Sequence, residues 1–239
     1  MDFIRPQNGE IQVFGLDSRN DSVAIKNTVG FLSSDSILYP KWSGDQYLAF
    51  LAKMRGPADM TSLIKRLDLD PSIQYRHLSS GNKQKLALVV AMYGMPKLLV
   101  MDEPTKALDP LLQQEIYTVL HEYRRDGGTV FVSSHNLPEV EKICDRVAVI
   151  KEGKIVANET MQSIREMAIH IISISTAAGI KQGDFELPNV EITHASEKHM
   201  LLKVKGDLNP VLHVLNKYKL KDLEVNHANL EDIFLEYYK

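Results

Sequence analysis

The chain has 239 residues, of which 44% are hydrophobic and 25% are charged, an ordinary composition for a soluble globular protein. This length suits one large domain, or a main domain with a small appendage. The net charge of -3 argues against a dedicated nucleic-acid-binding protein. The single cysteine, Cys144, excludes an intramolecular disulfide and a cysteine-cluster metal site. No apolar run approaches the length of a membrane span, and no signal peptide is expected at Met1.

Strands and helices are predicted in alternation as far as Val156. Apolar runs and the helical spacing of apolar residues predict strands at Glu10–Phe14, Thr28–Leu32, Leu98–Met101, Thr129–Ser133, Arg146–Ile150 and Lys154–Val156, and helices at Gln46–Ala52, Met60–Leu67, Asn82–Met95, Pro110–Arg124 and Leu137–Cys144. Asp109 is predicted to cap the helix that begins at Pro110. Such alternation is typical of an α/β domain with a mostly parallel sheet.

The sequence changes character after about Met161. Short strands are predicted at Ile169–Ser175, Val190–Thr193, Met200–Lys205 and Leu220–Val225, with helices at Pro210–Tyr218 and after Asn229, whose capping-box partner is Asp232. We therefore expect a core domain over residues 1–161, with a helical subdomain at about 36–95, and a small α+β accessory domain over residues 162–239.

Two adjacent carboxylates follow the buried strand predicted at Leu98–Met101. The aliphatic run leads directly into Asp102 and Glu103, and Pro104 ends it. An apolar run without alternation is typical of a parallel sheet, whose ligands bind at the carboxyl ends of the strands. One carboxylate can hold Mg²⁺, directly or through water, and the other can orient or deprotonate an attacking water. A strand that merely ends in a polar turn is the alternative reading of this pair alone.

Three further signals accompany the acids. The segment "LSSGNKQK" opens a long helix whose free N–H groups and positive dipole end form an anion site, and Gly81 permits the close approach of a ligand. His135 follows the strand at Thr129–Ser133, where an imidazole can reach a phosphate oxygen or a polarised water. Ala107-Leu108-Asp109 ends seven residues after Asp102. Taken singly, an N-cap and a surface histidine are the commoner explanations.

Together these segments resemble the nucleotide-binding subunit of an ABC transporter. The segment "LSSGNKQKLALVVAM" is similar to the family's signature helix, "LLVMDEP" to its Walker B segment, "ALDP" to its D-loop and "VFVSSH" to its H-loop. "NGEIQVFGLD" is similar to the stretch that follows the Walker A helix, and "NLEDIFLEYY" to the end of ATPases paired with drug, antibiotic or lantibiotic exporters. The resemblance implies a P-loop NTPase-like fold with ATP and Mg²⁺ as cofactors.

The resemblance also implies a role for each matching residue. Asp102 is expected to hold Mg²⁺, directly or through water, and Glu103 to act as the general base. His135 is expected to stabilise the γ-phosphate and position the water. The residues expected to bind the γ-phosphate of the nucleotide held by a second subunit are Ser79, Gly81 and Asn82.

Two further loops carry expected contacts by the same resemblance. Asp109, in the D-loop, is expected to cross the interface between two subunits. The segment "VGFLSSDSILYP" falls where the family places its nucleotide-sensing Q-loop, and it contains no glutamine. Asp35 is the best match for the sensing residue there, and Ser34 is the alternative.

No Gly-x-x-x-x-Gly-Lys-[Ser/Thr] pattern occurs in the sequence. The family places this phosphate loop before the segment similar to "NGEIQVFGLD", so the chain is expected to be an ABC ATPase that lacks its Walker A segment. Such a loop supplies several charge-assisted hydrogen bonds of roughly 1.5–3 kcal/mol each, whereas millimolar binding amounts to about 4 kcal/mol in total. The 239-residue chain alone is therefore expected to bind ATP weakly in its own half-site.

The function implied by the resemblance is ATP binding and hydrolysis coupled to export through a separate membrane subunit. The expected partners are that permease and a second ATP-binding subunit, in a homo- or heterodimer, at the cytoplasmic face of the cell membrane. A non-catalytic ABC-like interaction or regulatory protein is the alternative, favoured by the missing phosphate loop. An ABC protein acting on ribosomes or DNA is less favoured, since the chain has one ABC copy and no basic surplus.

Overall fold

The computed structural model describes residues 6–34, 38–106, 108–166 and 169–227. It divides into two units, one within Met1–Asn136 and one within Leu137–Lys239. The domain boundary expected near residue 161 stays a prediction, and the helix expected after Asn229 lies outside the described residues. Within the described part of the chain, no helix is both long and apolar enough to cross a membrane.

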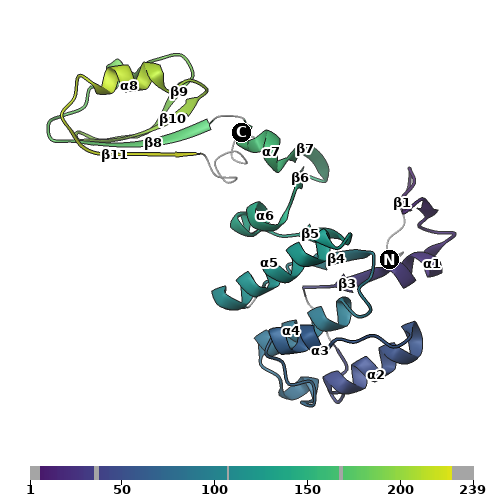
Figure 1. Ribbon diagram of the computed structural model, residues 1–239. Coiled ribbons are helices and arrows are strands. Elements are labelled where there is room, and N and C mark those ends of the chain that lie inside the picture. The colour runs from purple at the N-terminus through teal and green to yellow at the C-terminus, as the bar shows by residue number, and fades with distance from the viewer. Residues whose placement is uncertain (1–5, 35–37, 107, 167–168, 228–239) are drawn as a thin grey trace. The chain divides into compact units, whose positions relative to one another are not determined.

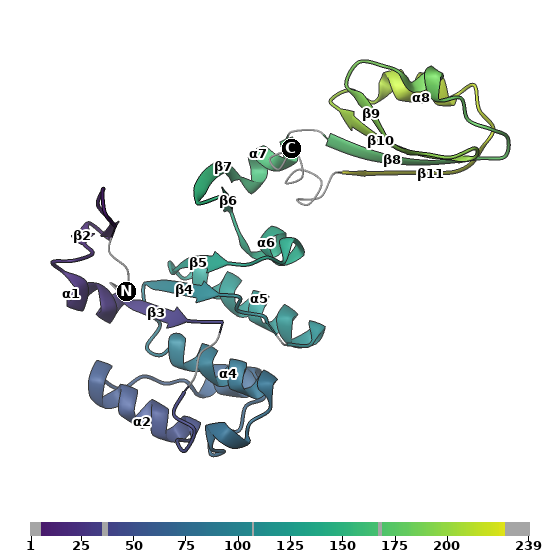
Figure 2. The same ribbon diagram turned by 180° about the vertical axis from the view of Figure 1, so that it is seen from behind.

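The first unit is built on a parallel sheet. Its strands β3 (Val29–Leu32), β4 (Leu98–Asp102) and β5 (Thr129–Ser133) lie in the order β3-β4-β5 and run in the same direction (Figures 1 and 2). The three strands and the parallel sheet predicted from the apolar runs are therefore confirmed. Because the strands are parallel, their carboxyl ends meet at one edge of the sheet.

The two faces of this sheet differ in burial. Leu99 and Met101 point to one face and are 0% and 1% exposed. Phe31, Val100 and Phe131 are aligned by the register on the other face. On that face Phe31 is 40% exposed and Phe131 is 67% exposed. We call these three residues, two phenylalanines with a valine between them, the aromatic stripe.

Helices cover the buried face of the sheet. Helix α4 (Ser80–Ala91) packs against β3, where a Cβ atom on Gly30 would lie 2.0 Å from the carbonyl oxygen of Ala91. Glycine is therefore required at this crossing. Helix α5 (Pro110–Arg125) contacts β5, and its N-cap is Asp109, with Pro110 in the first turn as predicted.

A group of helices lies between β3 and β4 in the chain. It consists of α2 (Gly44–Arg55), α3 (Thr61–Arg66), the 3₁₀ turn η1 (Tyr75–His77) and α4. Helix α2 begins with a capping box, in which the Ser43 hydroxyl accepts from the Gln46 amide and the Gln46 side chain accepts from the Ser43 amide. The predicted helices in this region are confirmed, with ends shifted by a few residues, as is usual for helix termini.

The residues before β3 differ from the prediction. Instead of one strand at Glu10–Phe14, a hairpin forms from β1 (Gln12–Val13) and β2 (Leu16–Asp17). The turn residues Phe14 and Gly15 have φ angles of 52° and 78°, the two positive values that a type I′ turn requires. An aromatic residue at a left-handed turn position gives no sequence signal, so the prediction ran the strand through it.

Helix α1 (Ser22–Thr28) was not predicted, because its valine, isoleucine and threonine are weak helix formers. Tertiary contacts stabilise it: Ile25 is buried. The guanidinium of Arg55 donates to the carbonyl oxygens of Lys26, at 3.0 Å, and Val29, at 3.2 Å. These bonds satisfy carbonyl groups at the helix end that have no partner within the helix.

The second unit contains an antiparallel sheet in the order β11-β8-β10-β9, with α8 on one face (Figure 1). Ile172, Leu202 and Phe185 are completely buried between the sheet and the helices. A separate antiparallel hairpin is formed by β6 and β7. The elements are α6 (Leu137–Ile143), β6 (Arg146–Lys151), β7 (Lys154–Thr160), α7 (Met161–Glu166), β8 (Ile169–Thr176), η2 (Gln182–Phe185), β9 (Val190–Ala195), β10 (His199–Lys205), α8 (Asn209–Leu215) and β11 (Leu220–His227).

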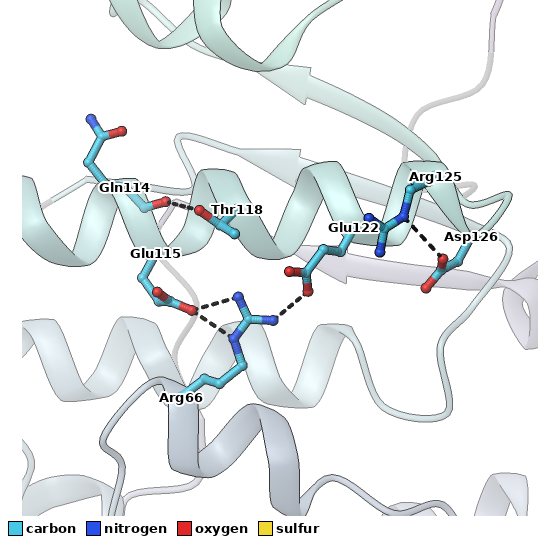
Figure 3. Close-up of polar contacts among 7 residues, drawn as sticks. All are labelled: Arg66, Gln114, Glu115, Thr118, Glu122, Arg125 and Asp126. Atoms are coloured by element: carbon cyan, nitrogen blue, oxygen red, sulfur yellow. Dashed lines mark hydrogen bonds and ion pairs between the residues drawn. The ribbon is translucent and has the colours of Figure 1, made fainter.

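An ion-pair cluster joins α3 to α5 (Figure 3). The Arg66 guanidinium donates to Glu115 Oε1 from Nε and pairs with it through Nη2, both at 2.7 Å, and it pairs with Glu122 Oε2 at 2.5 Å. Glu115 and Glu122 are two helical turns apart on α5, so both face α3. These two carboxylates raise the pKa of Arg66 above its usual range, with Glu122 the larger cause.

We expect Arg66→Met to lower the free energy of unfolding of the first unit by about 1 kcal/mol, because all three side chains keep partial contact with solvent. The loss should shrink at about 1 M salt, where the Debye length falls to about 3 Å. Denaturant unfolding at low and high salt is the measurement. The matched control is Arg125→Met, whose partner is the neighbouring, exposed Asp126 (Figure 3). An equal loss in the control would contradict a specific role for the α3–α5 cluster.

Candidate functional site

The carboxyl edge of the parallel sheet carries the predicted acids. Asp102 is the last residue of β4 and lies opposite Ser133 of β5. The Ser133 hydroxyl donates to Asp102 Oδ1 at 2.6 Å. Hydrogen bonds from Ser133 and then Ser34 hold the pKa of Asp102 below its usual value, and the positive charge of Lys106 acts in the same direction. Asp102 is therefore ionised at neutral pH and offers oxygen atoms at the sheet edge.

Glu103 is held in an unusual backbone conformation beside Asp102. Its φ angle is 51°, in the left-handed region that residues other than glycine rarely adopt. Its amide donates to the carbonyl oxygen of Ser133 at 2.9 Å, and its carbonyl oxygen accepts from the Lys106 amide at 3.1 Å. A strained conformation of this kind persists only where surrounding contacts enforce it, and such positions are common at functional sites.

The Glu103 carboxylate meets His135. Glu103 Oε1 accepts from the His135 amide at 2.9 Å and lies 2.6 Å from His135 Nδ1. The Glu103 side chain is 19% exposed, whereas the His135 side chain is 84% exposed. The carboxylate is thus partly enclosed, and the free edge of the imidazole faces solvent, where a substrate can reach it. The structure brings the predicted Asp102, Glu103 and His135 together at one sheet edge.

This arrangement suits a cation that keeps much of its water. Among the residues that the structure describes, no group of three or more His, Cys, Asp or Glu side chains is placed to hold a metal ion. Mg²⁺ does not need such a group, because it is usually bound through one or two carboxylates, several waters and the oxygens of a phosphate. The ionised Asp102 carboxylate fits that role.

The start of α4 forms a second group of predicted residues. Ser79 is the N-cap, and its hydroxyl accepts from the Asn82 amide at 3.2 Å. Ser79 and Ser80 are exposed, and Gly81 and Asn82 are partly exposed. The exposed first turn of α4 therefore directs the positive end of the helix dipole toward solvent.

The remaining predicted residues are placed differently. Asp109 caps α5, where its carboxylate accepts from the Leu112 amide at 3.0 Å. Its carboxylate thus already has a partner in its own helix. Asp35 lies outside the described residues, whereas the alternative Ser34 is described and contacts Asp102.

One residue of the site was missed by the sequence analysis. Gln84 of α4 is 9% exposed, and its Nε2 donates to the carbonyl oxygen of Pro104 at 2.9 Å. The same nitrogen lies 3.5 Å from the carbonyl oxygen of Glu103. The signal available in the sequence was a glutamine next to the apolar residues of the signature segment. Its hydrogen-bond partner could not be predicted, because that partner is a backbone group 20 residues away in sequence.

Comparisons with known proteins show the family and the fold to which the chain is similar. Residues 17–140, just over half of the chain, match the family described as "AAA domain, putative AbiEii toxin, Type IV TA system". The chain is 29% identical to the bacitracin transport ATP-binding protein BcrA of Enterococcus faecalis, over 67% of this chain and 54% of that protein. It is 25% identical to the ABC transporter ATP-binding protein YcbN of Bacillus subtilis, over 98% of this chain and 80% of that protein.

The fold has solved counterparts. The ATP-binding subunit of an ABC transporter superposes with a TM-score of 0.65 at 24% identity, covering 69% of this chain and 72% of that chain. Among the sequence relatives, phospholipid-transporting ATPase ABCA7 of Homo sapiens is 30% identical over 63% of this chain. The matched region is only 7% of the length of that protein. The chain therefore belongs to the family described by that AAA-domain model, and it is similar in sequence to ABC transporter ATP-binding proteins. The α/β fold predicted from the sequence is confirmed.

We expect Ser133→Ala to lower the free energy of unfolding at pH 7 by roughly 1 kcal/mol, since it removes the main hydrogen bond to ionised Asp102. The pKa of Asp102 is depressed in the folded state, so this stability is present above the unfolded pKa of about 3.9 and is lost as pH falls through the folded pKa. Urea unfolding at pH 7 and at about pH 3 should show a difference that shrinks in acid.

The control for this prediction is Thr28→Val, which removes a hydrogen bond between a hydroxyl and the uncharged carbonyl oxygen of Ile25. Its cost should be the same at both pH values. If Ser133→Ala lowered the free energy of unfolding equally at pH 7 and at about pH 3, the hydrogen bond from Ser133 would not depend on ionisation of Asp102.

Proposed function

We propose that this chain is the ATP-binding subunit of an ABC exporter, and that ATP binding and hydrolysis at an interface between two such subunits drive a separate membrane subunit. The observation that carries the proposal is the Glu103–His135 pair, 2.6 Å apart beside the ionised Asp102. Two carboxylates and an imidazole at the carboxyl edge of a parallel sheet are the groups that water activation and phosphate binding require.

Each residue has a distinct task in this proposal. Asp102 holds Mg²⁺, directly or through water, and the ion neutralises charge on the phosphates when it is bound. Glu103 accepts a proton from the attacking water, and its partial enclosure limits competition from bulk solvent. The solvent-facing edge of His135 contacts the γ-phosphate, while its Nδ1 is held against Glu103. The expected order is alignment of the water, attack of its oxygen on the γ-phosphorus as its proton passes to Glu103, and cleavage of the bond between the γ-phosphorus and the β–γ bridging oxygen, so that ADP leaves and phosphate is released.

The proposed partners follow from the second group of residues. The exposed first turn of α4 suits a γ-phosphate presented by another subunit, which Ser79, Gly81 and Asn82 bind through backbone amides and short side chains. A second ATP-binding subunit, identical or homologous, supplies that nucleotide. Asp109 lies at the start of α5 and is proposed to face the same partner. Transport is the activity in the names of relatives, among them a bacitracin transport protein, and export as its direction is proposed from the sequence resemblance. Binding to a permease would place the subunit at the cytoplasmic face of the membrane.

The first test is ATP turnover with and without a phosphate loop. We expect the 239-residue chain alone to turn over little ATP, and the chain fused to the phosphate-loop segment of an intact homologue to hydrolyse it. In that active fusion, Glu103→Gln should keep ATP binding and lose at least about 10²-fold in turnover, because the amide cannot accept the proton of the water.

The matched control is Glu152→Gln, in the turn between β6 and β7. Glu152 has the same φ angle of 51° and is exposed, so the change removes an equivalent charge from an equivalent backbone position. Its turnover should equal that of the unmodified fusion. Full turnover in the Glu103→Gln protein would remove Glu103 as the base.

The second test concerns the dimer. We expect the chain to associate with an intact homologue in the presence of ATP, and Gly81→Asp to abolish this association. The new carboxylate and Cβ would stand against the γ-phosphate, so both charge and sterics oppose binding. Gly183→Asp is the control, because a Cβ there meets nothing within 4 Å. Association measured by sedimentation should be unchanged in the control, and equal association of the Gly81→Asp chain would contradict nucleotide contact at α4.

A non-catalytic interaction protein is the second candidate function. The aromatic stripe of Phe31, Val100 and Phe131 favours it, since an apolar row with two exposed aromatic side chains on one sheet face is typical of a contact surface. In that case the chain would associate with an intact homologue, and the fusion would show no turnover. The two tests above therefore separate the candidates.

A further inference from the structure

We propose that Gln84 is a positioning residue for Glu103, and that it ties the placement of the base to the placement of helix α4. The catalytic consequence rests on the proposed function, whereas the positioning itself is a property of the folded chain. Gln84 reaches the loop after β4 from a different element, so the backbone around Glu103 is held by α4 as well as by the sheet.

The Gln84 side chain is committed to this contact. It is buried in α4, with Nε2 at 2.9 Å from the carbonyl oxygen of Pro104 and 3.5 Å from that of Glu103. A buried primary amide is costly unless its N–H groups have acceptors. Here both acceptors are consecutive backbone carbonyl groups of the loop, so the amide fixes the orientation of the peptide units that flank the Cα of Pro104.

The Glu103 backbone needs such support. Its φ angle of 51° is unfavourable for a residue with a side chain. The sheet holds the Glu103 amide through Ser133, and the Lys106 amide holds its carbonyl oxygen. Gln84 acts on the same carbonyl oxygen and on the next one. Release of this side would let the left-handed conformation relax and would turn the Glu103 carboxylate away from His135.

The position of Gln84 in α4 also links Glu103 to the helix that is proposed to contact a nucleotide. It lies two residues after Asn82, in the helix whose first turn is proposed to meet the nucleotide of a second subunit. A small movement of α4 on nucleotide binding is therefore transmitted through Gln84 to Glu103 in the same chain. Since a misplacement of about 1 Å can cost about 10²-fold in rate, this link can match the activity of one site to occupancy of the other.

The test begins with the unmodified 239-residue chain. In ¹⁵N NMR spectra the side-chain amide protons of Gln84 should exchange with deuterium oxide much more slowly than those of a solvent-exposed amide. Exchange as fast as that of an exposed glutamine would overturn the proposal without any variant. The backbone amide of Lys106 should likewise be protected, because its acceptor is the Glu103 carbonyl oxygen.

Two variants then remove the contact. Gln84→Met keeps the approximate length of the side chain without a donor, and Gln84→Glu places carboxylate oxygens against two carbonyl oxygens. Both should increase Lys106 amide exchange at least about tenfold and shift the His135 ring signals, with the larger change for Glu, because buried acceptors that lose their donor or face like charge are unfavourable. The control Gln46→Met removes a hydrogen bond to Ser43 in the α2 capping box and should change neither readout.

Turnover in the active fusion completes the test. Gln84→Met should lower kcat by about tenfold to 10²-fold with little change in KM, because the base rather than nucleotide binding is displaced. Unchanged kcat in an active fusion, or unchanged Lys106 exchange and His135 signals, would overturn the positioning role. A fusion with no turnover in any form would instead contradict the proposed function, and the NMR measurements would still decide the role of Gln84.

Discussion

The parallel register between β4 and β5 is the constraint on which the site depends. It sets Asp102 opposite Ser133, so that the hydroxyl reaches the carboxylate and the Ser133 carbonyl oxygen is available to the Glu103 amide. His135 comes two residues after Ser133 in the chain, which brings its Nδ1 to 2.6 Å from Glu103 Oε1. A slip of one residue would turn alternate side chains to the opposite face and separate all of these groups. The burial of Leu99 and Met101 against the helices specifies the register, so packing of the core also determines the geometry of the site.

The two neighbouring acids acquire different properties from their surroundings. Asp102 receives hydrogen bonds from hydroxyl groups, which favour its ionised form and make it an oxygen ligand. Glu103 turns away from these hydroxyl groups because of its left-handed backbone, and its carboxylate contacts a histidine instead. One strand end thus presents two carboxylates with separate partners. A division of this kind is useful where one acid must bind a cation and the other must exchange a proton.

Much of this could be predicted from the sequence, and the omissions have physical causes. The apolar run before Asp102 predicted β4 as a strand of a parallel sheet, although only one face of it, that of Leu99 and Met101, is buried. Asp109 with Pro110 predicted the start of α5 because helix caps are local. The left-handed conformations of Phe14 and Glu103 were not predictable, since neither is glycine. Helix α1 depends on Arg55, and the role of Gln84 depends on a carbonyl group far away in the chain. These contacts are tertiary, and no local pattern contains them.

The aromatic stripe places exposed apolar surface directly beside the site. Phe31 and Phe131 flank Val100 on the same face that carries Asp102 and Ser133 at its edge, so a partner that covered the stripe would also border the site. An exposed apolar face of this kind favours nonspecific association with other protein chains. Binding of a partner to this face would therefore remove exposed apolar surface and change the surroundings of Asp102 and Ser133 in a single event.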